Sequence, residues 1–280
     1  LAKESARISS AIEWLDRIVG SLREALSPVA VIKSLDHWPD LGSDLDLYTS
    51  ASREGVMEVM QRKFRAELEP RSWGDKLAGK WNFRLPELKE LVEIHVRYLG
   101  QTGEQKLMAE RVIKRMEWQE IDGRKFPVPA PEERILISTL QRMYRHFYFR
   151  LSDVADTAAL VRSGRVNFDE LRDGAEAGGI WPGVASFLVI VLNYVTRFGG
   201  ALRLPPGVIG AARSEDLNVE FGRGFLRVPK KPAAALYRSQ LITAGKHGDL
   251  RAISRLPLLP GLAVSALIAF RLTGDDKGVW

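Results

Sequence analysis

The residues best suited to chemistry in this chain are two aspartates, Asp44 and Asp46, which flank Leu45 and directly follow Ser43. Alternation of apolar and polar residues over 45–49 predicts a strand. Residues two apart in a strand project to the same face, so both carboxylates point one way while Leu45 turns towards the core. Paired carboxylates repel each other unless a cation neutralises them, and oxygen ligands suit Mg²⁺. The alternative is an exposed edge strand that carries two acids.

A third carboxylate, Glu93, lies in the most strictly alternating stretch of the chain, residues 91–97, where His95 and Arg97 share its face. A two-metal phosphoryl-transfer site uses three acids, of which two bridge both ions and the third binds the ion that activates the attacking hydroxyl. Glu93 completes such a set with the two aspartates. The alternative pairs Glu93 with Arg97 or a lysine on an exposed face.

The elements that must position these acids are predicted from apolar spacing and turn residues. Apolar residues three and four apart indicate a helix over 5–26, which Pro28 ends. The strands at 81–85 and 91–97, separated by a turn near Pro86, form a plausible hairpin. The other elements expected in this half are strands at 29–34, 45–49 and 65–69 and helices at 52–63 and 104–116.

The second half of the chain is predicted to be mainly helical. A Pro-rich connector at 126–131 marks a domain boundary, which separates a catalytic domain over 1–126 from a helical domain over 127–280. The stretch 199–232 is rich in Gly, Pro and Arg and receives no assignment. The fold class is therefore α+β, with a mixed sheet and flanking helices first. Helices are expected at 131–150, 151–162, 168–177, 180–198, 233–244 and 262–272.

Composition excludes several kinds of site. The chain of 280 residues has no cysteine, which excludes disulfides, zinc-thiolate sites and cysteine nucleophiles. Its four histidines are scattered, which argues against the His-rich ligation of many metal-dependent phosphohydrolases. The net charge of +6 favours polyanions such as nucleotides or RNA, although an ordinary basic protein has the same balance.

Two uncharged apolar stretches, 180–196 and 256–270, bear on membrane contact. Both are short for a membrane span, and we expect both to be buried core helices. A surface-lying helix at about 256–272 is the alternative, which would make the protein membrane-associated. With no secretory signal at the start of the sequence, a cytoplasmic location without membrane contact is expected.

The order of the acids resembles the signature of the DNA polymerase beta-like nucleotidyltransferases. That signature is a strand ending in Gly-Ser, then about ten residues, then D-x-D on the next strand and one acid on a later strand. Here Ser34 lies ten residues before Asp44. Lys33 stands where the superfamily usually has Gly, which is a departure in the segment expected to approach phosphate.

More narrowly, the chain is similar to the bacterial uncharacterised nucleotidyltransferases. That group combines a Gly/Ser-Asp-apolar-Asp core with a later acid-apolar-His strand and a helical half, here Glu93-Ile94-His95 and the helix from Pro131. A further likeness is to nucleotidyltransferase toxins of abortive-infection systems, which modify transfer RNA. The resemblance covers about residues 29–165.

The resemblance implies transfer of a nucleoside monophosphate from a nucleoside triphosphate, ATP among them, to a hydroxyl acceptor, with release of pyrophosphate. Transfer RNA or another RNA is one implied acceptor; a protein or small-molecule hydroxyl, or an inactive nucleotide-binding module, are alternatives. Asp44, Asp46 and Glu93 would be catalytic and hold two Mg²⁺ ions. The implied nucleotide-binding residues are Ser34, Lys33, Ser43, Lys76 and Lys80. For the three lysines, the alternative is an ordinary position on the protein surface.

Basic residues also gather in the helical half. Arg142, Arg145 and His146 have spacings that let them share a helix face. Such a face could grip triphosphate or nucleic acid, or it could simply be solvated. Asp153 and Asp156 are candidates to pair with these arginines.

Overall fold

The computed structural model describes residues 2–26, 28–212, 219–222 and 225–273. Contacts divide the chain into two compact units. The first runs to Ala130 and takes in the segment from Ser254 onward, and the second is Pro131–Ile253. The division between the units lies close to the Pro-rich segment, whereas no pattern in the sequence indicates that the C-terminal segment returns to the first unit.

The first unit is built on a mixed five-stranded sheet with the strand order β1-β2-β5-β4-β3. Strands β2 and β5 are parallel, and the other neighbouring pairs are antiparallel. This mixed sheet and the helical second unit confirm the expected α+β fold class. The strands are β1 (Val29–Val31), β2 (Asp44–Thr49), β3 (Glu67–Leu68), β4 (Lys80–Arg84) and β5 (Leu91–Val96).

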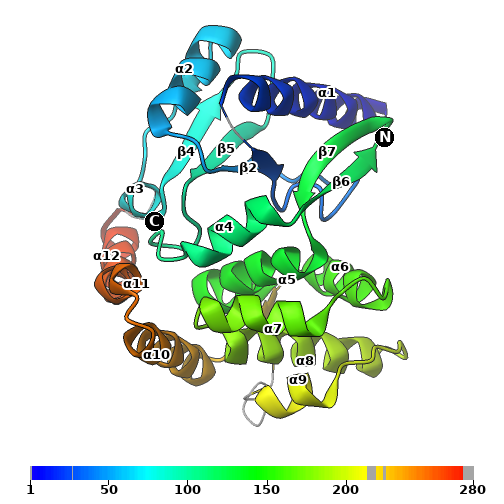
Figure 1. Cartoon of the computed structure of the whole chain (residues 1–280), viewed down its shortest axis with the longest axis vertical. Helices are drawn as coiled ribbons and strands as arrows, with labels where there is room; N and C mark the ends of the chain where they lie inside the picture. Colours follow the sequence, from blue (N-terminus) through cyan, green and yellow to red (C-terminus); the bar gives the residue numbers. More distant parts are fainter. Residues whose placement is uncertain (1, 27, 213–218, 223–224, 274–280) are drawn as a thin grey trace. The chain divides into compact units, whose positions relative to one another are not determined.

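Helices α1 and α2 cover one face of this sheet (Figure 1). Leu45, Leu47, Val92 and Ile94 turn to these helices and are fully buried, because alternate strand residues share a face. The residues between them, the acids included, must therefore lie on the opposite face. The helices of this unit are α1 (Ala2–Ala25), α2 (Arg53–Phe64), α3 (Trp73–Ala78), α4 (Leu107–Lys114) and α12 (Leu258–Thr273).

The Pro-rich segment is a strand and not the connector that its composition predicts. Strands β6 (Met116–Ile121) and β7 (Arg124–Pro129) form an antiparallel hairpin. Proline is tolerated there because alternate residues of an antiparallel pair make no ladder hydrogen bonds to the partner strand. Pro127 and Pro129 are two apart, and the N–H of Ala130 donates to the carbonyl of Arg115, so both prolines occupy the non-bonded positions.

The second unit is a helical assembly around α8, in which every residue from Gly183 to Val191 is buried. The expected core helix at 180–198 is thus confirmed. Phe187 of α8 stacks on Phe149, and the Tyr144 ring lies so close to Gly183 that no larger residue fits there unchanged. The helices are α5 (Pro131–Thr139), α6 (Leu151–Arg162), α7 (Phe168–Ala177), α8 (Trp181–Arg197), α9 (Pro206–Ala211) and α10 (Lys230–Lys246), and α11 (Leu250–Arg255) crosses into the first unit.

The helix expected over 131–150 breaks in the middle. After α5 the chain forms a π-helical turn, η1 (Leu140–His146), and then enters β8 (Tyr148–Phe149). Strand β8 joins a small antiparallel sheet with β10 (Phe225–Arg227) and β9 (Glu220–Gly222). The π-helical turn changes the side-chain spacing, and Arg142 is buried against Asp153 instead of sharing a solvated face.

The apolar C-terminal helix differs from expectation. Val264, Ile268 and Leu272 of α12 are exposed, so this helix is not the buried core helix that its composition predicts. By length and composition alone, the helical stretch Leu250–Thr273 could cross a membrane. Arg255 ties its start to the first unit, because its guanidinium donates to the carbonyls of Leu77 and Thr102 at 2.8 and 2.6 Å.

One buried acid of the first unit makes stability depend on pH. Glu104 is buried, and its carboxylate accepts hydrogen bonds from the N–H and the hydroxyl of Thr102 at 2.9 and 3.1 Å. Burial nevertheless raises the pKa of Glu104 above its ordinary value of 4.5. As the pH rises past 4.5, the unfolded chain ionises Glu104 first, so the folded state loses stability until the pH passes the folded pKa.

Replacing Glu104 by Gln should remove this loss, because a neutral amide keeps an oxygen that accepts from Thr102. Urea unfolding at about pH 4.5 and about pH 8 should show that the unmodified chain loses stability relative to Glu104→Gln as the pH rises. Glu67→Gln, at an exposed position, is the control and should behave like the unmodified chain. Equal falls in all three proteins would contradict the prediction.

Candidate active site

The strand register brings the acids together. Because β2 and β5 are parallel neighbours, Asp46 lies directly opposite Glu93, and Asp44 lies opposite Leu91. Asp44 and Asp46 share a face by alternation, so all three carboxylates lie on the face that α1 and α2 leave uncovered. Carboxylate and imidazole atoms of Asp46, Glu93 and His95 lie within 4.8 Å of one another. The structure therefore brings Asp46 and Glu93 together with His95, and it places Asp44 on the same face of the sheet.

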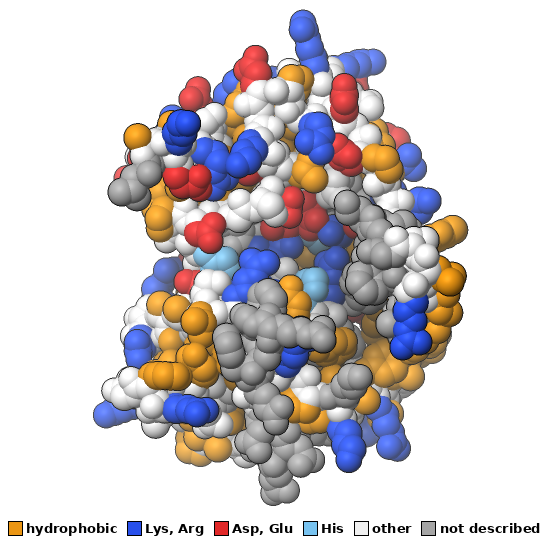
Figure 2. All heavy atoms as spheres, turned by 180° about the vertical axis from the view of Figure 1, so that it is seen from behind, with side chains coloured by type: hydrophobic (Ala, Val, Ile, Leu, Met, Phe, Trp, Pro, Cys, Tyr) orange, Lys and Arg blue, Asp and Glu red, His pale blue; other side chains and the backbone are white. Residues whose placement is uncertain are grey.

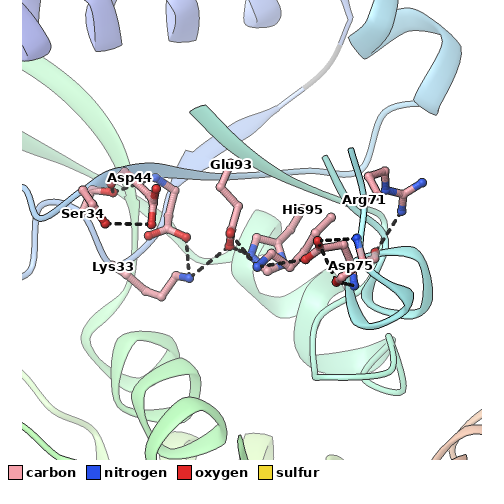
Figure 3. A network of polar contacts seen from close by, with 11 residues as sticks. Lys33, Ser34, Asp44, Arg71, Asp75, Glu93 and His95 are labelled. Carbon is pink, nitrogen blue, oxygen red and sulfur yellow. Dashed lines mark hydrogen bonds and ion pairs between the residues drawn. The ribbon is translucent and has the colours of Figure 1, made fainter. Parts of the chain in front are cut away.

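Lys33 enters this cluster from the turn after β1. Its ammonium nitrogen, Nζ, lies 2.5 Å from Oδ1 of Asp46 and 3.6 Å from Oε1 of Glu93 (Figure 3). The backbone of Lys33 is left-handed, with φ of 66°, and the N–H of Ser34 donates to the carbonyl of Ile32 across it. This conformation favours glycine, which is the usual residue at this position in the superfamily that the sequence resembles. The chain keeps a glycine-like backbone and adds a cation.

The two serines near the acids bind protein groups. The hydroxyl of Ser34 accepts the N–H of Asp46 at 2.7 Å and donates to the carbonyl of Asp44 at 3.2 Å. It thereby fastens the turn after β1 to the strand that carries both aspartates. Ser43 donates its hydroxyl to Oδ2 of Asp44 at 3.1 Å. Both hydroxyls therefore help to hold the aspartates of β2 in position.

Strand β4 supplies a second lysine to the site. Lys80 lies opposite His95 and is buried, although its sequence context is typical of a surface residue. Its Nζ lies 2.6 Å from Oε2 of Glu93 and 3.4 Å from Oδ1 of Asp75. Glu93 therefore contacts a lysine on each side, and the polar contacts continue from Lys33 through Glu93 to Asp75 (Figure 3).

The two facing carboxylates differ in their affinity for a proton. Burial raises the pKa of Asp46 to about 8, and the charge of Glu93 adds to this against the opposing effect of Lys33. Burial acts on Glu93 too, but Lys33, the His95 hydrogen bond and Lys80 together hold its pKa well below the ordinary value. Asp46 therefore keeps its proton to a higher pH than Glu93 does in the metal-free protein.

His95 is a neutral imidazole at physiological pH. Burial lowers its pKa to about 4, even though the neighbouring Glu93 favours the charged form. Its Nε2 lies 2.8 Å from Oε1 of Glu93, so the proton on Nε2 donates to that carboxylate. The other nitrogen, Nδ1, is then an acceptor, and it has no hydrogen-bond partner among the residues that the structure describes. Oδ1 of Asn82, which lies opposite Glu93 on β4, is likewise without one in the described part of the chain.

Lys76 lies outside the acid cluster. It is exposed on α3, and its Nζ lies 4.8 Å from the centre of the Trp73 ring. Nearby, the guanidinium groups of Arg71 and Arg53 lie 3.6 and 4.3 Å from the centre of the buried Trp81 ring. Acidic and basic side chains adjoin one another on one face of the molecule (Figure 2).

The donor set fits a divalent cation. Carboxylate oxygens from neighbouring strands are the ligands that Mg²⁺ and Mn²⁺ prefer, and Mg²⁺ is commonly held by one or two carboxylates together with water and phosphate. Asp46, Glu93 and His95 offer ligand atoms within 4.8 Å, and Asp44 adds a carboxylate on the same face. The ammonium of Lys33, which lies against Asp46 and Glu93, shows that this place accepts positive charge.

Two further residues of the site, Asp75 and Asn82, escape prediction from motif spacing alone. His95 was expected on the face of Glu93 from strand alternation, and the structure places it there. Asp75 carries only a local signal, because the sequence Ser72-x-x-Asp75 predicts the capping box that starts α3. Nothing local places Asn82 opposite Glu93, because that depends on the register between β4 and β5.

Comparisons with known proteins give distant likenesses. No protein-family profile matches the sequence. No curated protein matches it either. Among solved structures, the chain is similar to the antibiotic-resistance factor ANT(2'')-Ia, with 11% identity and a TM-score of 0.44 over 68% of this chain and 98% of that chain. It is also similar to an antigenic nucleotidyltransferase-like protein from Paracoccidioides brasiliensis, with 15% identity and a TM-score of 0.44 over 74% of this chain and 98% of that one.

Both likenesses are too distant to assign a function, which has to be inferred from the side chains of the site itself.

Proposed function

We propose that this chain is a metal-dependent nucleotidyltransferase, which transfers a nucleoside monophosphate from a nucleoside triphosphate to a hydroxyl acceptor. One observation carries the proposal: Asp44 and Asp46 alternate on β2, and Glu93 faces Asp46 from the parallel strand β5. Three carboxylates on one sheet face are costly to hold together unless positive charge lies among them, and a divalent cation meets that need. Phosphoryl transfer is the chemistry that such a cation site serves best.

In the proposed reaction the oxygen of the acceptor hydroxyl attacks the α-phosphorus of the triphosphate. A new phosphorus–oxygen bond forms, the bond to the β-phosphate oxygen breaks, pyrophosphate leaves, and the hydroxyl proton passes to solvent. Bound Mg²⁺ would supply charge neutralisation of the phosphates and activation of the hydroxyl. Asp44 and Asp46 would hold the ion that carries the triphosphate, and Glu93 would complete the position of a second.

The remaining residues would orient the acids and the nucleotide. Ser34 fixes the backbone of Asp44 and Asp46, which keeps both carboxylates aligned along β2. Lys80 and His95 hold Glu93 in its ionised form. Lys76, which is exposed on α3, would contact the phosphates of an incoming nucleotide such as ATP.

The acceptor is a separate question. Transfer RNA or another RNA is consistent with the net charge of +6. A protein hydroxyl or a small molecule is an alternative acceptor for the same three acids. An inactive module that binds metal and nucleotide without turnover is the rival function, and the ion pair between Lys33 and Asp46 is the observation that favours it.

The test is an incubation of the protein with Mg²⁺, each of the four α-³²P-labelled nucleoside triphosphates and total bacterial RNA, resolved on one gel. An Asp44→Ala, Asp46→Ala double variant runs beside the unmodified chain. We expect label that depends on both aspartates, and its position identifies the acceptor as RNA or protein. Thin-layer separation of the same reactions detects a labelled small molecule. If no labelled product forms and no pyrophosphate is released, while Mg²⁺-nucleotide still binds in calorimetry, the chain is the inactive binding module.

A further inference from the structure

We infer that the ammonium of Lys33 is an internal cation that occupies the place of one divalent ion and has to withdraw before that ion binds. The inference deepens the proposed function, since it concerns the same three carboxylates. It predicts that Lys33 lowers the affinity of the site for divalent metal. Lys33 would thereby set the metal concentration at which the site fills.

The position of the ammonium is the first ground. Nζ of Lys33 lies between two carboxylates that face each other across β2 and β5, at 2.5 Å from Asp46 and 3.6 Å from Glu93. These are two of the groups whose ligand atoms cluster within 4.8 Å of one another. An ion that used both carboxylates would meet the ammonium in the same place.

The backbone is the second ground. Lys33 adopts a left-handed φ of 66°, and the N–H of Ser34 donates to the carbonyl of Ile32 at 2.7 Å to close a turn around it. A residue with a side chain is strained there, whereas glycine is not. Since glycine would be the unstrained choice, the strained lysine indicates that its side chain contributes something at this position, and its contacts show that this is positive charge.

The charge balance is the third ground. Glu93 contacts Lys33 on one side and Lys80 on the other, and Lys33 also contacts Asp46. With two ammonium groups beside them, these two carboxylates carry no excess negative charge even without a metal. A divalent ion added beside an ammonium that stays in place would be repelled by it, and the repulsion is strong where water is scarce. Withdrawal of Lys33, a long and flexible side chain, removes that repulsion.

The experiment measures Mn²⁺ binding to the whole chain without nucleotide, by the loss of the free-ion signal in electron paramagnetic resonance. Lys33→Met removes the charge and keeps the length, whereas Lys33→Gly removes the charge and relieves the backbone. Lys33→Arg keeps the charge. Lys63→Met is the matched control, because Lys63 is exposed on α2 and pairs with Glu24 at 3.3 Å.

We expect the dissociation constant for Mn²⁺ to fall at least about tenfold in Lys33→Met and Lys33→Gly, and to stay within about twofold of the unmodified chain in Lys33→Arg and Lys63→Met. The rise in melting temperature on adding Mn²⁺ should be larger in the two neutral variants than in the unmodified chain. Lys33→Gly is included because glycine adopts the left-handed backbone of this position without strain. An unchanged or weaker affinity in both neutral variants, or no Mn²⁺ binding by any of the proteins, overturns the inference.

The same proteins separate this inference from the proposed function. One outcome is that the neutral variants bind Mn²⁺ more tightly while none of the proteins transfers a nucleotide to any acceptor. That outcome supports the role of Lys33 and counts against the proposed transferase activity. The other outcome is that the unmodified chain transfers nucleotide but its affinity for Mn²⁺ does not depend on Lys33. That outcome overturns the inference about Lys33 and leaves the proposed function standing.

Discussion

The Asp46→Asn protein is expected to transfer nucleotide at least about a thousandfold more slowly than the unmodified chain, a loss of about 4 kcal/mol of transition-state stabilisation. Asp46 faces Glu93 across the two parallel strands and shares a face with Asp44. It is therefore the acid that links the other two in the proposed cation site. An amide keeps the shape of the carboxylate but cannot carry the negative charge that a divalent ion needs. The measurement is the initial rate of label transfer from the nucleotide identified above.

The same substitution should leave the fold intact. Burial raises the pKa of Asp46 to about 8, so its carboxyl group is mostly protonated in the metal-free protein at neutral pH, and asparagine resembles that form. An acid whose pKa is raised on folding costs stability as the pH rises from its unfolded pKa towards the folded one. The melting temperature of Asp46→Asn in a chelator should therefore be no lower than that of the unmodified chain at about pH 8.

The control for this prediction is Asp16→Asn. Asp16 is an exposed acid on α1, the helix on the opposite face of the sheet, and its replacement makes the same chemical change. Its transfer rate should stay within about twofold of the unmodified chain, which is a negligible free-energy difference. Transfer by Asp46→Asn at a rate close to that of Asp16→Asn would show that Asp46 is not a metal ligand in the reaction.

Replacing Arg142 by Met is expected to destabilise the second unit by about 3 kcal/mol. Arg142 is 3% exposed, and its guanidinium lies 2.9 Å from Oδ1 of Asp153, which is 2% exposed. The other oxygen of Asp153 accepts the N–H of Arg150 at 2.6 Å at the start of α6. Removing the cation leaves Asp153 buried without this partner, and a buried charge that loses its partner costs far more than an exposed one. Urea unfolding followed by far-ultraviolet circular dichroism measures the loss.

Two further variants make this test specific. Arg172→Met breaks an exposed pair with Glu176, where the nitrogen–oxygen distance is 2.8 Å, and should leave the stability essentially unchanged. The double variant Arg142→Met, Asp153→Asn should regain most of the lost stability, because it removes the buried charge as well. If Arg142→Met proves as mild as Arg172→Met, the buried pair does not stabilise the unit.

Local patterns in the sequence determined which face each residue of the central strands takes. Alternation put Asp44 and Asp46 on one face of their strand, and the same rule put Glu93 with His95. Helices α6 and α7 begin and end where apolar spacing and turn residues predict, because these signals lie within the elements themselves. The candidate acids were accessible from the sequence for the same reason.

Only the tertiary structure decided which residues became neighbours. Asp46 meets Glu93 because β2 and β5, far apart in the chain, pair in parallel with one particular register. The left-handed turn after β1 turns Lys33 into that site, although its type and position are equally compatible with an exposed lysine. The burial of Arg142 against Asp153 and the exposure of α12 likewise depend on how the elements pack. A local pattern specifies the direction of a side chain, but the residue that it meets depends on packing between distant segments.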